Sequence, residues 1–223
     1  MKRLLLALLL AACAPLDEAQ RLDAAPEATM PIAAWRPGAP QPFVASRGNA
    51  EMVRDFLELG FQMESGRAIP AFSRFDGPVR VVPRGAAPSG ALADLDRLLA
   101  RLRDEAGLDI ARTDTPLDGE ATITLEFLPR RQMQAVVPAA ACFVVPNVST
   151  WEEFTVNRRS PVIDWTRVVQ RQRVVVFIPS DTTPQEIRDC LHEEIAQGLG
   201  PLNDLFRLPD SIFNDDNFQT TLT

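Results

Sequence analysis

The chain has 223 residues, which suits one domain with an extension, and its 23 basic and 30 acidic residues give a net charge of −7. Lys2 is the only lysine, His192 is the only histidine, and tyrosine is absent. A catalytic zinc centre with several histidine ligands therefore cannot be built from one copy of this chain, and no P-loop lysine is available beyond residue 2. An acidic chain is also a poor ligand for polyanions, so we expect no nucleic-acid partner.

The first twelve residues have the layout of a secretory signal peptide. Lys2 and Arg3 precede an apolar run at 4–12, which is too short to span a bilayer. The sequence L-A-A-C at 10–13 resembles the lipobox of bacterial lipoproteins, and an ordinary signal peptide is the alternative. The resemblance implies cleavage before Cys13 and a membrane anchor through lipid on its sulfur. The residue directly after Cys13 is Ala14 rather than an aspartate. The resemblance therefore favours the inner leaflet of the outer membrane, facing the periplasm.

Residues 13–47 are rich in Ala, Pro and charged residues, a composition that breaks helices and denies hydrogen bonds to strands. We interpret this segment as a lipidated, extended tether that holds a folded domain away from the membrane. The sequence thus predicts three parts, which are a signal peptide at 1–12, the tether at 13–47 and a single globular domain at 48–223.

The first half of the predicted domain contains two helices and two strands. Asn49 can cap a helix that runs to Leu59. The apolar face of this helix consists of Met52, Val53, Phe56 and Leu57. A short strand spans 78–83 with a proline at each end, and Ser89 and Gly107 open and close an amphipathic, leucine-rich helix. Residues 121–128 alternate between apolar and polar side chains, which predicts a strand.

The second half is expected to complete the sheet. Val136-Val137 and residues 141–145 predict short strand pieces, and residues 151–154 predict a loop between strands. The continuous apolar run at 173–178 is typical of an interior strand. Helices and strands alternate only partly along the chain, so we expect an α+β fold.

A helix is predicted over 184–199. Thr183 is its N-cap, Pro184 its first residue, and Glu186 completes a capping box. One apolar stripe consists of Ile187, Leu191, Ile195 and Leu199. Gly200 suits the left-handed position that ends many helices.

Two cysteines besides Cys13 remain, at positions 142 and 190. In an oxidising periplasm two such residues pair more often than they stay reduced. We therefore predict a disulfide between Cys142 and Cys190, with two buried free thiols as the alternative.

The segment 190–204 reads C-L-H-E-E-I-A-Q-G-L-G-P-L-N-D and holds the candidate site residues. On a helix Glu193 and Gln197 project side by side, because they are four residues apart. Glu194 lies 100° around the helix from Glu193, since an α-helix has about 3.6 residues per turn. A turn after Gly200 can bring the Asn-Asp pair at 203–204 back toward that face. His192 precedes the acidic pair, and a lone histidine is more typical of a solvated or capped side chain than of a ligand.

The spacing resembles the motif H-E-x-x-H-x-x-G-x-x-H/D of the metzincin metalloproteases. In that alignment Glu193, Gln197 and Asn203 take the three metal-ligand positions, Glu194 takes the position of the general base, and Gly200 is the turn glycine. The base and the glycine match, and all three ligand positions differ. The remaining oxygen donors suit Ca²⁺ or Mg²⁺ better than zinc, so we expect no zinc cofactor and at most weak Ca²⁺ binding.

Pieces spread over 49–217 resemble a second family. They are D-F-L-E-L-G-F at 55–61, P-V-R-V at 78–81, C-L-H-E-E-I-A-Q-G-L-G at 190–200, N-D at 203–204 and S-I-F-N-D at 211–215. These stretches resemble the proteobacterial lipoproteins called domain of unknown function 2927, a family with no established activity. Its E-E-x-x-Q-x-L-G-x-x-N-D stretch is similar to a zincin active-site helix with altered ligands. The two resemblances together imply a zincin-like mixed sheet packed against helices.

Three functional interpretations follow. The first is an envelope lipoprotein of unknown molecular activity whose domain is a non-catalytic, zincin-like binding or structural module for a peptide or an envelope protein. Its polar cluster or cleft would contain His192, Glu193, Glu194, Gln197, Asn203 and Asp204. The second is a periplasmic hydrolase of peptide or peptidoglycan, in which Glu193 and Glu194 divide the roles of acid and base. The third is a helix with an exposed acidic face and no site.

Overall fold

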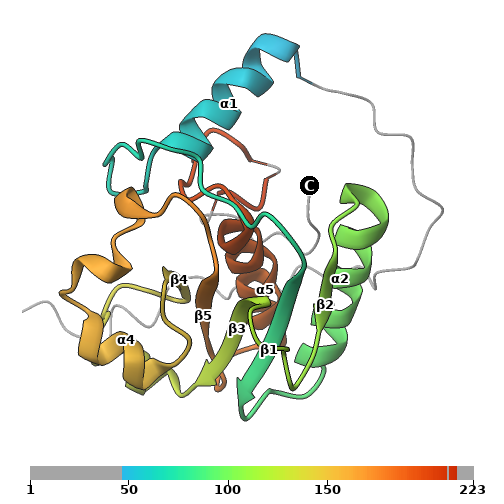
Figure 1. Cartoon of the computed structure of the whole chain (residues 1–223), viewed down its shortest axis with the longest axis vertical. Coiled ribbons are helices and arrows are strands. Elements are labelled where there is room, and N and C mark those ends of the chain that lie inside the picture. The colour runs from blue at the N-terminus through green and yellow to red at the C-terminus, as the bar shows by residue number, and fades with distance from the viewer. Residues whose placement is uncertain (1–46, 210, 215–223) are drawn as a thin grey trace, which may run out of the picture. The chain divides into compact units, whose positions relative to one another are not determined.

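The computed structural model describes residues 47–209 and 211–214 (Figure 1). The signal peptide at 1–12, Cys13 and all but the last residue of the tether at 13–47 lie outside the described residues and stay predictions. Within the described part of the chain, no helix is both long and apolar enough to cross a membrane.

Five strands form one mixed sheet in the order β2-β1-β3-β5-β4. The strands are β1 (Val79–Gly85), β2 (Ile110–Arg112), β3 (Ala121–Leu128), β4 (Phe143–Pro146) and β5 (Arg173–Pro179). The first three and β5 run parallel, and β4 pairs with β5 in the antiparallel direction at one edge. The mixed α+β fold is therefore confirmed, and β5 is the interior strand that its apolar run predicted.

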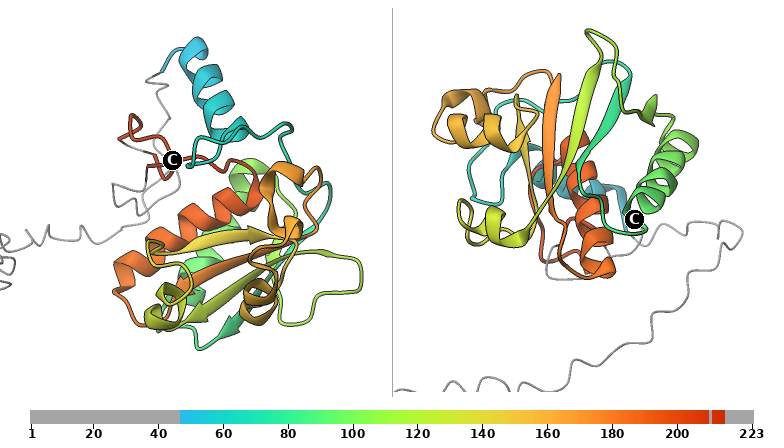
Figure 2. Two further views of the ribbon diagram at one scale, coloured as in Figure 1. Left: turned by 90° about the vertical axis from the view of Figure 1, so that its left-hand side faces the viewer. Right: turned by 90° about the horizontal axis from the view of Figure 1, so that it is seen from below.

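Helices cover both faces of this sheet. The helices in the described part of the chain are α1 (Asn49–Phe61), α2 (Ala91–Ala106), α3 (Arg130–Gln134), α4 (Trp151–Asn157) and α5 (Pro184–Leu199), with 3₁₀ turns η2 (Pro161–Ile163) and η3 (Trp165–Arg167). Helices α2 and α5 pack on one face and α4 on the other (Figure 2). The alternation of β5 divides its side chains between the two cores. Val174, Val176 and Ile178 join α2 and α5, whereas Val175 and Phe177 join the aromatic residues of α4.

The sequence suggests that β1 ends at its second proline, Pro83. The strand in fact continues past this residue. The N–H of Val79 and the C=O of Val81 both bond toward β2, so by alternation the nitrogen of Pro83 faces that side too. Strand β2 ends at Arg112, opposite Val81. Pro83 therefore breaks no ladder bond, and β1 continues beside β3 to Gly85.

Two predictions in the second half of the chain are wrong. Val136 and Val137 form no strand, because both backbone N–H groups bond to the carbonyl of Met133 in the turn that follows α3. Residues 151–154 are no loop but the start of α4, where the Thr150 side chain accepts a hydrogen bond from the N–H of Glu153. The strand expected over 141–145 is shifted to Phe143–Pro146.

In both early helices the N-cap is a glycine rather than the residue that the sequence suggested. Gly48 is the N-cap of α1, one residue before Asn49, and Gly90 is the N-cap of α2, one residue after Ser89. Gly90 and the closing Gly107 have φ of 86° and 66°, a backbone region that favours glycine. The four apolar residues that follow the helical period of α1 are exposed, namely Met52, Val53, Phe56 and Leu57.

Helix α5 spans the predicted residues with the predicted capping box at Thr183 and Glu186. Ile187, Leu191 and Ile195 are buried, as their spacing requires. Gly200 ends the helix but is not left-handed, since its φ is −168°. A Cβ at Gly200 would lie 2.8 Å from the ring of Phe72, so close packing explains the glycine.

Candidate functional site

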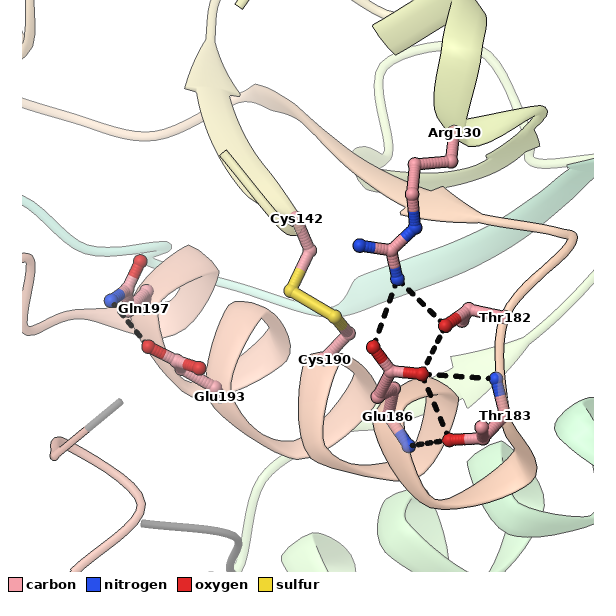
Figure 3. Close-up of a disulfide and its surroundings, with 8 residues drawn as sticks. All are labelled: Arg130, Cys142, Thr182, Thr183, Glu186, Cys190, Glu193 and Gln197. Atoms are coloured by element: carbon pink, nitrogen blue, oxygen red, sulfur yellow. Dashed lines mark hydrogen bonds and ion pairs between the residues drawn. A yellow bond between two sulfur atoms is a disulfide. The ribbon is translucent and has the colours of Figure 1, made fainter. Parts of the chain in front are cut away.

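Helix α5 is fixed to the edge strand by a covalent bond. The predicted disulfide is present between Cys142, directly before β4, and Cys190 on α5, with a Cα–Cα distance of 5.9 Å (Figure 3). It crosses from the free edge of the sheet to the middle of the helix. The residues that follow Cys190 on the same helix are therefore held close to β4.

The N-terminus of α5 is held by charge-assisted hydrogen bonds. The Glu186 carboxylate accepts hydrogen bonds from Thr182 Oγ1, from the Thr183 N–H at 3.1 Å and from Arg130 Nη2 at 2.9 Å (Figure 3). Chiefly through the bond from Thr182, these contacts lower the pKa of Glu186 to about 2. The carboxylate thus stays ionised where the positive end of the helix dipole favours a negative charge.

The C-terminus of α5 is bound by a buried arginine that no local sequence pattern indicates. The Arg171 side chain is 1% exposed. Its Nη1 donates to the carbonyls of Gln197 and Gly198 at 2.5 and 2.6 Å, and its Nη2 donates to that of Gly200 at 2.5 Å. The guanidinium also lies 4.6 Å from the ring centroid of Trp165. Burial lowers the pKa of Arg171 to about 9, which leaves it charged at neutral pH.

Between these two ends, three of the predicted site residues come together. Glu193 and Gln197 point to the same side of α5, with Gln197 Nε2 3.5 Å from Glu193 Oε1 (Figure 3). The same amide donates to Glu64 Oε1 at 3.3 Å. Carboxylate oxygens of Glu193 and Glu194 and the Cys142 Sγ lie within 4.8 Å of one another. We call Glu64, Glu193, Glu194 and Gln197 the carboxylate cluster.

Glu194 is the enclosed member of this cluster. Its side chain is 3% exposed, and no hydrogen-bond donor to its Oε2 is found among the described residues. Burial raises the pKa of Glu194 well above its ordinary value, and the negative charges of Glu193 and Glu64 raise it further. Two adjacent carboxyls therefore sit in different environments, one half-buried and one enclosed.

This environment predicts a pH dependence of stability. Because the pKa of Glu194 is higher in the folded state than in the unfolded state, its contribution is fully present at low pH and is lost as the pH rises through the folded-state pKa. We expect Glu194→Gln to match the wild type near pH 4 and to be more stable than it near pH 8, each in urea denaturation with a chelator present. A difference that is constant with pH would contradict the burial of an ionisable group here.

Glu186→Gln supplies a control of opposite sign. The pKa of Glu186 is lowered in the folded state, so its contribution is present above the unfolded-state pKa and is lost as the pH falls. This variant should be less stable than the wild type near pH 7, and the difference should shrink in acid. Effects of titrating groups that do not interact with Glu186 or Glu194 are common to the three proteins and cancel.

The other predicted members of the cluster face elsewhere. A lone histidine is expected to be solvated or capped, but His192 is buried, with 8% of its surface exposed. Burial lowers its pKa to about 4, and the charged groups that act on it are those of Arg188 and of α2. Asn203 Nδ2 donates to the carbonyl of Glu58 at 3.1 Å, so it fastens the segment after α5 to α1. Asp204 is half-buried in the same segment.

Two hollows lie at the C-terminal end of α4, and both are lined by Arg158 and Arg159. One, of about 320 Å³, is completed by Val136, Val137 and Phe154. The other, of about 460 Å³, adds Met63, Arg67, Ser160, Pro161, Ile163, Asp164 and Trp165. Neither hollow includes Glu64 or a residue of α5, so the carboxylate cluster lies outside both of them.

A comparison with known protein families matches the domain that contains these residues. The model of the family described as "Protein of unknown function (DUF2927)" matches residues 49–223. The chain belongs to this family. Searches of the curated proteins and of the solved structures found no match. The DUF2927 match spans α1 through α5 and therefore includes Glu64 as well as the residues of α5 in the carboxylate cluster. The family description assigns no activity.

Within this DUF2927 domain, sequence reasoning missed Glu64 and Arg171. Glu64 meets Gln197 across 133 positions of the chain, and Arg171 meets the end of α5 across 26 to 29 positions. No local pattern marks either residue, because their roles depend on the tertiary fold. The metzincin resemblance of α5 stays a prediction.

Proposed function

We propose that the protein is a periplasmic lipoprotein, anchored through Cys13 to the inner leaflet of the outer membrane, whose domain binds an extended acidic peptide segment without cleaving it. The address rests on the signal-like residues 1–12 and the lipobox that ends at Cys13. The binding activity rests on one observation, the unpaired outer edge of β4.

The hydrogen-bond pattern identifies which groups of β4 are available. The Asn147 N–H donates to the Arg173 carbonyl at 2.7 Å, and β4 pairs with β5 in antiparallel register. Because antiparallel residues alternate, the N–H and C=O of Val144 point away from β5. Neither group has a backbone partner among the described residues. An extended peptide could pair with them and add a strand to the sheet.

The surroundings of β4 favour an acidic peptide. Phe154, which lines the smaller hollow, packs on Phe143 of β4 at 5.4 Å between ring centroids. The turn η2, which lines the larger hollow, contacts β4 as well. Arg158 and Arg159 line both hollows and are exposed. Side chains of a bound peptide would therefore meet apolar walls rimmed by two guanidinium groups, which suit carboxylates.

The absence of cleavage in this proposal is supported by the chemistry of α5. The residues at the metzincin ligand positions carry carboxylate and amide oxygens, which bind zinc weakly. Asn203 at the third position already donates to a backbone carbonyl. A zinc-bound hydroxide therefore has no suitable set of ligands here.

One observation favours the hydrolase as a second candidate. Glu194 is enclosed and has a raised pKa, whereas the adjacent Glu193 is half-buried. A pair of carboxyls in such unequal environments is the arrangement by which enzymes divide acid and base roles. Turnover of peptide or peptidoglycan by the wild type, abolished in Glu194→Gln, would favour this candidate.

Binding can be tested at the Val144 N–H. We expect the full chain to bind peptides rich in Asp and Glu on an array of short unstructured peptides. Val144→Pro should weaken this binding about 3- to 10-fold, since it removes one outward hydrogen-bond donor but no bond to β5. Affinities would be measured by fluorescence anisotropy with the best peptide from the array.

Two control variants separate the backbone and charge contributions. Val144→Ala keeps the N–H and should bind like the wild type. Arg158→Ala should lose the preference for acidic peptides. Arg84→Ala should keep it, because Arg84 lies on β1, which β3 and β5 separate from β4. Equal binding by wild type and Val144→Pro would refute strand addition at β4.

A further inference from the structure

The carboxylate cluster gathers oxygen atoms from two distant parts of the chain. Glu193, Glu194 and Gln197 come from α5, and Glu64 comes from the segment between α1 and β1. Their exposure is graded, because Glu64 is exposed, Glu193 is half-buried and Glu194 is enclosed. The oxygens therefore lead from the solvent to a buried carboxylate.

The buried end of this path has an unmet requirement. Glu194 Oε2 is enclosed and has no hydrogen-bond donor among the described residues. Among the described residues, the ionised groups that act on this carboxyl are Glu193 and Glu64, which carry the same charge. A buried carboxylate without a donor or a counter-charge is costly. Either a proton or a cation between the carboxylates would remove this cost.

We propose that the carboxylate cluster binds one divalent cation, and that Ca²⁺ is the ion it fits best. Carboxylate oxygens of Glu64, Glu193 and Glu194 would bind it, together with Gln197 Oε1 after the terminal amide turns over. All four ligands are hard oxygen donors, and the nearby Cys142 sulfur is in a disulfide and offers no thiolate. Ca²⁺ tolerates irregular geometry and completes its shell with water, whereas Mg²⁺ demands a near-ideal octahedron.

This site goes beyond peptide binding, because it needs no peptide to form. The ion would join the segment that carries Glu64 to α5. Met63, the neighbour of Glu64, lines the larger hollow beside β4. Ca²⁺ would thereby fix one wall of that hollow as well as neutralise the cluster.

The test is Ca²⁺ titration of the full chain after EDTA treatment and desalting. Calorimetry should detect one Ca²⁺ per chain, and the melting temperature should rise by several degrees at saturating Ca²⁺. Glu194→Gln should bind Ca²⁺ at least tenfold more weakly and lose most of the rise. Glu105→Gln, an exposed glutamate on α2 that pairs with Arg101, should keep both.

The competing explanation makes different predictions. If a proton rather than a cation neutralises Glu194, Ca²⁺ will change neither the heat nor the melting temperature, and the proposal fails. A rise of equal size in the wild type and in Glu194→Gln would also overturn it, because the ion would then bind elsewhere. Should Glu194→Gln not fold, Glu64→Gln applies the same test at the exposed end of the cluster. No outcome depends on peptide binding, which is measured separately.

Discussion

Replacement of Arg171 by methionine is expected to destabilise the protein by about 3 kcal/mol or more, since three buried carbonyls each lose a charged donor. Those carbonyls, of Gln197, Gly198 and Gly200, end α5 and accept bonds from one guanidinium group. Methionine fills a similar volume but donates nothing. The measurement is the free energy of unfolding in urea, followed by tryptophan fluorescence because Trp165 lies against the guanidinium.

Two further variants make this result specific. Arg171→Lys keeps the charge but cannot reach three carbonyls at once, so its loss should be intermediate. Arg67→Met removes an exposed pair with Asp164 and should cost less than about 1 kcal/mol. If Arg171→Met unfolds within about 1 kcal/mol of the wild type, the carbonyls must be satisfied by other means, and the role given to Arg171 is wrong.

Loss of the disulfide is expected to have an effect of similar size. The double variant Cys142→Ala, Cys190→Ala should lose about 4 kcal/mol, because a bridge across 48 positions no longer restricts the unfolded chain. The wild type treated with a dithiol reductant should unfold at the same urea concentration as the double variant.

This disulfide also has a local effect that hydrogen exchange can detect. Strand β4 has four residues, and β5 is the one strand of the described residues that pairs with it. Without the bond to α5, the amide of Val145 should exchange faster, whereas amides of the interior strand β3 should change only in proportion to global stability. Unchanged exchange at Val145 would mean that pairing with β5 suffices to hold the edge.

Elements defined by local patterns could be predicted from the sequence, and those defined by distant contacts could not. Strand β3 alternates between apolar and polar residues, and α5 begins with a capping box, so each carries its own signal. The sequence does not reveal the start of α4, because Trp151 and Phe154 give only a single turn of helical spacing. Their burial beneath the sheet is decided by Phe177, a residue on another strand.

The candidate site divides in the same way. Helical spacing alone placed Glu193 and Gln197 side by side, and the structure has them so. The predicted polar cluster also includes His192 and, through a turn after Gly200, Asn203, yet His192 faces α2 and Asn203 bonds to α1. Helix periodicity states which residues share a face. It does not state what each face meets, and it could not supply Glu64.

The order of strands has a consequence for how the chain reaches its native state. Strand β5 lies between β3 and β4 in the sheet but follows both in the chain. Until residues 173–179 are available, β3 has an open edge and β4 has no partner. Such long-range pairing slows folding and leaves aggregation-prone edges exposed in the meantime. A chain truncated before β5 would therefore depend on chaperones or be degraded, even if its N-terminal half is synthesised correctly.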